Sequence, residues 1–479
     1  MSTLDILTIP QAELLSSKSH IVPGQLNVAE LFFKVPLDYT DLNGPSITLF
    51  ARRVRKHEVP IFPHEDEDDA NAKDDNGEPP KPYMIYLEGG PGFGNREPQD
   101  HPLTRHALAK GYQLLLIDHR GVGLSTPVGA EMLSNISGDV EGRARYLSLM
   151  RQDNTVRDCE AVRKCLTASW PASKQPWSIF GQSYGGFISL SYLSMHPEGL
   201  REVFLTGGLA PVGKTPDQLY EATFRRVTER NEQYYDKFPE DIDNIRQIAS
   251  FIESKGGSIP LPAGGVLTVP RLLTMGIAFG GHGGFDQVHA AILTLKTSLD
   301  QLGFFNRASL VPLEGWNPFD TNIIYAILHE AIYCDGPGSH SRWAANRVGK
   351  ALEPFAWLNK DFSTASTSGP LYFSGEMIFP FHFDTYPELQ TLRQEAELLA
   401  NREWPALYDQ EKLRRNKVPV YAVSYVEDMY VDYDFARDTA KIVKGTKTFE
   451  TNVMYHSALR AKSDEILQQL FSLRDDVMD

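Results

Sequence analysis

The sequence has few cysteines and no excess of positive charge. Three cysteines among 479 residues are an odd number and too few for a disulfide framework, so they favour a reducing compartment. Lys and Arg total 47 against 62 Asp and Glu, which gives a net charge of −15. Because a nucleic acid or an anionic membrane selects a basic protein face, this balance argues against both as partners.

Long apolar runs are also absent. No uninterrupted apolar segment of the sequence is long enough to span a bilayer. The first residues, Met1 to Leu7, lack the basic region and the apolar run of a signal peptide, so we expect a cytoplasmic protein. Apolar residues nevertheless make up 42% of the chain, which is enough for a sizeable core. The length predicts one large domain with an insertion, or two domains.

Short apolar segments bounded by turns predict β-strands in the first 210 residues. Two of them, 28–36 and 46–53, flank a turn signal at 41–44 and predict a hairpin. Four further strands alternate with helices, namely strands 83–87, 113–118, 177–180 and 202–206 and helices 153–168 and 186–196. Near-continuous apolar strands that alternate with helices indicate a parallel sheet covered by helices on both faces.

The alternation stops after Pro211, and the following sequence reads mostly as helices. Strands and helices alternate again near the C-terminus, with strands at 418–424 and 448–453, a helix at 435–443 and a last helix at the end. We therefore predict one α/β domain with a helical insertion. The predicted divisions are 1–210 and 386–479 for the α/β core and 211–385 for the insertion. The Asp/Glu-rich run at 64–80 is expected to be a solvated loop.

The pattern G-x-S-x-G occurs at residues 181–185, with Ser183 at its centre. It follows a predicted strand and opens a predicted helix, which is the setting of a nucleophile elbow. Small residues on both sides of the serine allow a tight turn that holds it in a strained conformation. We predict that Ser183 is a nucleophile and that the Tyr184 N–H and the helix N-terminus face the developing oxyanion.

A serine hydroxyl is a poor nucleophile without a base and an acid that orients the base. Where a nucleophile elbow is present, the acid and then the histidine follow the serine along the chain, each on a loop after a strand. His456 follows the last predicted strand and is the expected base. His329 and His382 fall inside the predicted insertion, where no such loop is expected.

The loop after the strand at 418–424 carries four candidate acids. We expect Asp428 to be the orienting acid, because it sits where the loop turns above the sheet. Asp432 is the alternative, although Asp432 and Asp434 lie where a helix starts and suit N-capping. Glu427 is the fourth acid of this loop.

A glycine-rich segment, Glu88-Gly89-Gly90-Pro91-Gly92, follows the strand at 83–87. Glycines let the backbone approach a substrate carbonyl, so a backbone N–H near Gly90 is the expected second oxyanion donor. Asp118 and Arg120, after the next strand, are expected to hold neighbouring loops by ion pairing rather than to act on a substrate. No H-E-x-x-H motif or Cys/His cluster occurs, so the sequence predicts neither a metal ion nor a cofactor.

Taken together, these motifs resemble the proline iminopeptidases, also called prolyl aminopeptidases. The resemblance rests on G-G-P-G at 89–92, D-x-R-G-x-G-x-S at 118–125 and G-x-S-Y-G-G at 181–186, and on segments typical of the longer members at 328–334, 375–380, 404–409 and 427–432. It covers nearly the whole chain, from Leu31 to Arg460. The sequence departs from the family at Glu88, where many members have histidine, and in the acidic run.

The resemblance implies an α/β-hydrolase fold with a mainly helical cap inserted after the sixth strand. It also implies a serine exopeptidase that releases N-terminal proline from peptides with a free amino end. A cap over the serine would exclude internal peptide segments, and a carboxylate in the cap could pair with the substrate ammonium. By this resemblance Glu330 is the first candidate for that contact and Glu376 the second.

Other interpretations of the same residues stay open. Cys334 lies one helical turn from Glu330 and could face the same pocket, although a buried structural cysteine is the simpler account. The aromatic residues near these acids include Trp343, Phe373, Phe379 and Phe381. A broader aminopeptidase or an esterase on the same scaffold is an alternative function, and a non-catalytic binding protein with this fold is another.

Overall fold

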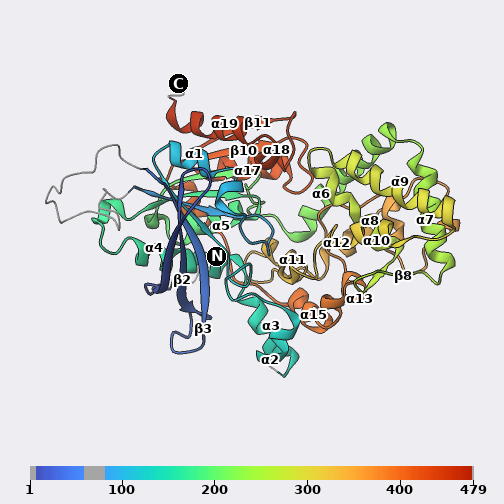
Figure 1. The fold of residues 1–479 in the computed structure, drawn as a ribbon, viewed down its shortest axis with the longest axis horizontal. Coiled ribbons are helices and arrows are strands. Elements are labelled where there is room, and N and C mark those ends of the chain that lie inside the picture. The colour runs from blue at the N-terminus through green and yellow to red at the C-terminus, as the bar shows by residue number, and fades with distance from the viewer. Residues whose placement is uncertain (1–6, 59–80, 137, 477–479) are drawn as a thin grey trace.

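A nine-stranded sheet forms the centre of the α/β part (Figure 1). The computed structural model describes residues 7–58, 81–136 and 138–476, so the acidic run at 64–80 lies outside the described residues. The strands run in the order β1-β2-β3-β5-β4-β6-β7-β10-β11. Their bounds are β1 Glu13–Val22, β2 Leu26–Pro36, β3 Ser46–Lys56, β4 Tyr83–Leu87, β5 Gln113–Ile117, β6 Trp177–Gln182, β7 Leu200–Thr206, β10 Val420–Tyr425 and β11 Thr446–Thr451.

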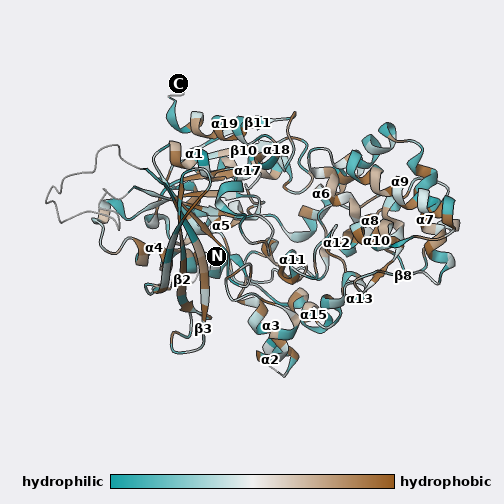
Figure 2. Ribbon diagram, in the orientation of Figure 1, coloured by the Kyte–Doolittle hydropathy of each residue, from teal (hydrophilic) through white to brown (hydrophobic). Residues whose placement is uncertain are grey.

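The strands from β5 to β11 pair in parallel, whereas β1, β2, β3 and β5 pair antiparallel. Strands β4, β5, β6 and β10 are buried at every position, and Figure 2 shows apolar residues along these central strands. Ile85 and Ile179 join the apolar cluster of α4 (Gln152–Leu166) and α5 (Tyr184–Met195). Met84 and Phe180 join that of α1 (Thr104–Ala109) and α19 (Ser463–Asp475). The predicted parallel sheet with helices on both faces is therefore confirmed.

Strand β1 was not expected from the sequence. Its residues are exposed along almost the whole strand, including Leu14, Leu15 and Ile21, so it lacks the apolar alternation that marks a half-buried strand. It forms the edge of the sheet and pairs only with β2 among the described strands. With β1 included, the insertion follows the seventh strand rather than the sixth.

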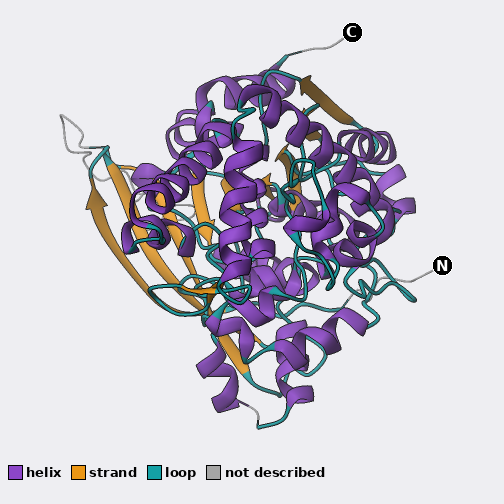
Figure 3. Ribbon diagram, turned by 90° about the vertical axis from the view of Figure 1, so that its right-hand side faces the viewer, coloured by secondary structure: helices purple, strands orange, loops and turns teal. Residues whose placement is uncertain are grey.

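Helices fill most of the chain between β7 and β10, as the sequence predicted. They are α6 Pro216–Lys237, α7 Asp241–Ser254, α8 Val269–Leu273, α9 Gly284–Leu302, α10 Arg307–Glu314, α11 Ile323–Leu328, α12 Ala344–Lys350, α13 His382–Thr385, α14 Pro387–Gln390, α15 Arg393–Asn401 and α16 Gln410–Arg414. In Figure 3, viewed from the side of the insertion, helices lie in front of the sheet. None of the described helices is long and apolar enough to cross a lipid bilayer.

The last part of the insertion also packs on the α/β core. Helix α15 lies beside α3 (Val140–Ser148), and the two are joined by an ion pair between Arg143 and Glu395 at 2.6 Å. Apolar residues of α3, α11 and α15 belong to one buried cluster. The divisions at 210/211 and 385/386 stay predictions, since helices on both sides of residue 385 share this cluster.

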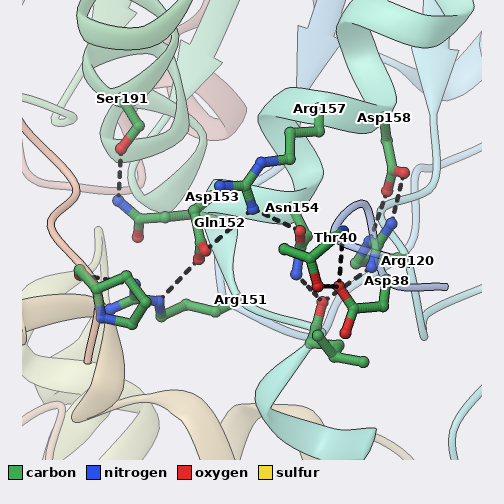
Figure 4. Close-up of polar contacts among 12 residues, drawn as sticks. Asp38, Thr40, Arg120, Arg151, Gln152, Asp153, Asn154, Arg157, Asp158 and Ser191 are labelled. Carbon is green, nitrogen blue, oxygen red and sulfur yellow. Dashed lines mark hydrogen bonds and ion pairs between the residues drawn. The ribbon is translucent and has the colours of Figure 1, made fainter. Parts of the chain in front are cut away.

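A buried polar network at the start of α4 ties the core to the insertion (Figure 4). Arg151 donates to the carbonyl oxygens of Cys334 and Pro405, each at 2.9 Å, and its Nε donates to Asp153 at 2.8 Å. Its side chain is 0% exposed, so each of these bonds replaces one that water would have made. Gln152, next to it, donates to Ser191 of α5.

We expect the replacement of Arg151 by Met to destabilise the fold. The change removes three hydrogen bonds and leaves a buried carboxylate at Asp153 without its nearest cation, which costs about 3 kcal/mol. Urea unfolding measures the difference. Arg105→Gln is the control, because Arg105 is 80% exposed and pairs with Asp464 at the surface. An equally small effect in both variants would contradict a structural role for Arg151.

Candidate active site

Ser183 lies at the junction of β6 and α5, in the predicted turn. Its φ of 53° and ψ of −121° are unusual for a residue other than glycine, and such a backbone costs about 1–3 kcal/mol. Neighbouring backbone holds the conformation, because the Ser183 N–H donates to Thr206 O at 3.0 Å and the Ser183 carbonyl accepts from the Gly186 N–H at 2.8 Å. Ser183 is buried, with 8% of the residue exposed.

Two glycines of the motif are required by close backbone approach. A Cβ at Gly185 would lie 1.9 Å from the carbonyl oxygen of Leu87, at the end of β4. A Cβ at Gly181 would lie 2.5 Å from the carbonyl oxygen of Gly185. The glycines thus permit the predicted tight turn, and the elbow packs directly on the neighbouring strand.

His456 and Asp428 meet at the ends of two neighbouring strands. His456 Nδ1 and Asp428 Oδ2 are 2.7 Å apart, and both side chains are almost fully buried. Asp428 Oδ1 accepts from the backbone N–H groups of Tyr430 and Val431, which fixes the carboxylate. Asp428 accepts a hydrogen bond from His456 Nδ1, so Nδ1 carries the proton when the ring is neutral. Nε2 then has the free lone pair with which His456 can act as a base.

The alternative acid has a different role. Asp432 is the N-cap of α17 (Tyr433–Ile442), where its Oδ1 accepts from the Phe435 N–H at 3.0 Å. This is the capping role that its position in the sequence suggested. Of the two acids, only Asp428 contacts His456.

Gly207 connects the histidine with the elbow. It follows Thr206, whose carbonyl accepts from the Ser183 N–H, and a Cβ at Gly207 would lie 3.0 Å from His456 Nδ1. With φ of 53°, Gly207 also has a backbone conformation that suits glycine. The end of β7 thus contacts both Ser183 and His456.

Opposing effects set the pKa of His456. Burial lowers this pKa, but the Asp428 carboxylate, by its charge and its hydrogen bond, more than offsets burial. Glu376 raises it further and Arg460 lowers it. The net result is a pKa of His456 above its ordinary value of 6.5.

The glycine-rich loop after β4 lies against the serine. A Cβ at Gly89 would lie 3.1 Å from Ser183 Cβ and 2.4 Å from Gln182 Oε1, so the loop backbone approaches the serine closely there. Tyr184 begins α5, and its N–H therefore belongs to the first helical turn, where no intrahelical acceptor exists. The loop that carries Gly90 and the helix that carries Tyr184 thus both border Ser183.

Asp118 and Arg120 fix loops, as expected. Asp118 accepts from the backbone N–H groups of Asn95 and Leu124 at 2.8 and 3.0 Å, so it acts through hydrogen bonds rather than an ion pair. Arg120 forms a bidentate ion pair with Asp158, at 2.6 and 2.7 Å (Figure 4).

The two glutamates of the insertion have different surroundings. Both carboxylate oxygens of Glu330 accept from backbone N–H groups of α12, those of Ala344 and Ala345, at 3.2 and 3.0 Å. Burial raises the pKa of Glu330 to about 7. Glu376 is half-buried, and its Oε1 accepts from Tyr325 Oη at 2.6 Å. Among the described residues, no cationic side chain forms an ion pair with Glu376.

Tyrosines that the sequence did not single out link these groups. Burial raises the pKa of Tyr333 well above its ordinary value, and Glu376, Asp428 and Glu330 each raise it further. Burial raises the pKa of Tyr220, and both glutamates raise it further. The buried hydroxyl of Tyr220 has no hydrogen-bond partner among the described residues. The sequence places Tyr333 one helical turn from Glu330. The effect of Glu376 and Asp428 on Tyr333 could not be predicted, because these residues come from distant segments that no sequence pattern joins.

The aromatic residues that did stand out in the sequence pack against one another. Phe373 contacts the rings of Tyr234 and Phe279, and Phe379 stacks on Phe381. Trp343 packs against Phe383.

Cys334 is fully buried, with its Sγ 3.6 Å from the carbonyl oxygen of Glu330. Burial raises the pKa of its thiol to about 12, so the thiol is protonated at neutral pH. A structural role accounts for these contacts.

Comparisons with known proteins identify the fold and the family of the chain. A family model described as alpha/beta hydrolase fold matches residues 82–250. The chain is 36% identical over 472 residues to a proline iminopeptidase of Aspergillus aculeatus, which covers 98% of this chain and 99% of that protein. It is 37% identical over 465 residues to the proline iminopeptidase of Aeromonas sobria, which covers 96% and 100%. The chain, built on an α/β-hydrolase fold, therefore belongs to the proline iminopeptidase family.

Proposed function

We propose that the protein is a prolyl aminopeptidase, a serine exopeptidase that releases proline from the free amino end of peptides. Membership of the proline iminopeptidase family supports this function, since the two full-length relatives carry that name. The observation that carries the chemistry is that the end of β7 contacts both the strained Ser183 and the buried His456–Asp428 pair. The three free cysteines support a cytoplasmic location.

Ser183, His456 and Asp428 act as nucleophile, base and orienting acid. The Ser183 oxygen attacks the carbonyl carbon of the N-terminal proline while His456 Nε2 takes its proton, and the Asp428 carboxylate stabilises the imidazolium. The N–H groups of Tyr184 and Gly90 stabilise the oxyanion. His456 then protonates the leaving amine, the C–N bond breaks, and water hydrolyses the prolyl ester of Ser183.

Glu376 is the group we assign to the substrate ammonium. Only one carbon separates the amine of an N-terminal residue from the carbonyl under attack, so the amine-binding carboxylate must lie near the catalytic residues. Glu376 meets this condition because it accepts a hydrogen bond from Tyr325, whose backbone packs against Gly92 of the glycine-rich loop. It also lacks a cationic partner among the described residues. A bound ammonium would supply that partner.

Glu330 is the second carboxylate of this proposal. Its two oxygens already accept hydrogen bonds from the backbone of α12, so it holds that helix in place. These contacts favour Glu376 over Glu330 for the direct ammonium contact, which reverses the order expected from the sequence.

Replacing Ser183 by Ala should reduce turnover of a prolyl 4-nitroanilide by at least about 1000-fold, because the nucleophile is lost. Labelling by a fluorophosphonate should disappear with it, and the unfolding midpoint should be unchanged. Ser194→Ala is the matched control, since Ser194 lies on the same helix and its hydroxyl donates to Leu190 O at 3.0 Å. Undiminished turnover in Ser183→Ala would refute the mechanism, and labelling absent from the wild type would indicate a non-catalytic binding protein.

The activity should fall on acidification with a midpoint above 6.5. His456 must be neutral to accept the serine proton, and its pKa is raised, so activity is complete above that pKa and lost as the pH falls through it. The measurement is kcat/KM against pH, which reports the ionisation of the free enzyme. The pKa of Glu330 is about 7, so its titration could also reduce the activity on acidification. Glu330→Gln is therefore the control, and its activity should fall on acidification with the same midpoint as that of the wild type. A midpoint below 6.5 would be incompatible with the His456–Asp428 pair acting as described.

Glu376→Gln should raise KM for a prolyl 4-nitroanilide by about 10- to 100-fold, because a charged hydrogen bond to the ammonium is lost. KM for 4-nitrophenyl acetate, which has no amine, should change less than about twofold. Glu330→Gln should have a smaller effect on the prolyl substrate. Equal changes for both substrates would exclude Glu376 as the ammonium ligand.

Preference for the ester, or for alanyl over prolyl substrates, would favour the esterase or the broader aminopeptidase.

A further inference from the structure

An ion pair joins the glycine-rich loop to the segment that follows His456. Glu88 is 3% exposed and stands at the start of the loop, and its Oε1 accepts from Arg460 Nη2 at 3.0 Å. Arg460 lies on α18 (Ala458–Ala461), four residues after His456. The pair therefore connects the two loops that supply the oxyanion donor and the base in the proposed mechanism, although 372 residues separate its members.

The same carboxylate oxygen holds the backbone of the loop. The Gly89 N–H donates to Glu88 Oε1 at 2.8 Å, and Tyr86 Oη donates to it at 3.4 Å. The bond to the Gly89 N–H fixes the peptide plane between Glu88 and Gly89, which directly precedes the plane that carries the Gly90 N–H. It thereby restrains the segment that presents the Gly90 N–H to a substrate carbonyl.

Each charge of the pair would oppose one half of the reaction if it stood alone. The Arg460 cation lowers the pKa of His456 and so disfavours the imidazolium that forms when Ser183 loses its proton. The Glu88 anion, bonded to the loop of the oxyanion donor, would repel the oxyanion. Opposite charges 3.0 Å apart offset each other at points that lie farther away than their own separation.

We propose that Glu88 and Arg460 are positioning residues for catalysis: the pair orients the oxyanion loop and cancels the charge that each member alone would impose on the reacting groups. This inference rests on the proposed Ser183–His456–Asp428 mechanism. It also gives a physical account of an acid at position 88, where many members of the family have histidine. Arg460 supplies the counter-charge that makes this acid compatible with a neighbouring oxyanion.

The sign of the effect on His456 follows from the groups that face it. Asp428 and Tyr430 approach it from the loop after β10, Glu376 from the insertion and Arg460 from α18. Of these four, Arg460 is the cation. Its removal should raise the pKa of His456, whereas removal of the Glu88 charge should leave Arg460 unpaired and lower that pKa.

The test is the pH dependence of kcat in the full chain, for Arg460→Gln, Glu88→Gln and the double variant. The acidic limb should move up by about half a pH unit in Arg460→Gln and down by a similar amount in Glu88→Gln. Glutamine at position 88 keeps an oxygen acceptor for the Gly89 N–H. The plateau kcat should fall about 3- to 30-fold in each single variant, and the double variant should return the limb close to its wild-type position.

Two controls separate charge from structure. Arg460→Lys keeps the cation and should leave the limb in place, and Arg105→Gln, at the exposed pair with Asp464, should do the same. The inference would be overturned if the midpoint of the acidic fall in kcat did not move, or if it moved in the same direction in both single variants. If Glu88→Gln does not fold, equal limbs in Arg460→Gln and Arg460→Lys would overturn it as well. An active Ser183→Ala would instead refute the proposed mechanism itself.

Discussion

The backbone at Ser183 is clamped between the ends of β4 and β7, and the rest of the site depends on this contact. On one side, Gly185 packs against the carbonyl of Leu87, and on the other the Ser183 N–H bonds to Thr206 O. The strained conformation of Ser183 persists because both contacts over-determine it. The next residues along the two strands complete the site, since Gly89 lies against Ser183 and Gly207 against His456. The position of the elbow thus determines the positions of the glycine-rich loop and of His456.

Electrostatic balance is the second feature of the site. Burial disfavours the charged form of His456, and Asp428 and Glu376 restore it. In the proposed substrate complex, an ammonium beside Glu376 would offset part of that carboxylate's effect and favour the neutral form of His456 that a base requires. Ammonium binding and base strength would then be coupled through Glu376. The Glu88–Arg460 pair fits the same picture, because it adds two charges near the reacting groups with little net effect.

Local patterns were sufficient to predict much of the fold and the chemistry. The elbow and Asp428 could be found because each follows an apolar strand, and His456 because it follows the last predicted strand. The carboxyl ends of parallel strands meet at one edge of the sheet. Strand β1 could not be found, because its exposed residues show no apolar alternation. Nor could the partners of Glu376 and Glu88, Tyr325 and Arg460, which lie 51 and 372 residues away. The partners of Glu330 lie only 14 and 15 residues away, but no sequence pattern joins them to it. The order of the two cap glutamates was set by family resemblance, which carries no information on hydrogen bonds to α12.

The central claim is that the serine acts on the first peptide bond of a chain with a free N-terminal proline. The most direct measurement is proline release by the wild-type protein from matched peptides that differ only at the amino end, with either a free or an acetylated N-terminal proline. The account predicts release from the free peptide and none from the acetylated one, because acetylation removes the ammonium that Glu376 is assigned to bind. Equal cleavage of both peptides, or cleavage of neither, would contradict it.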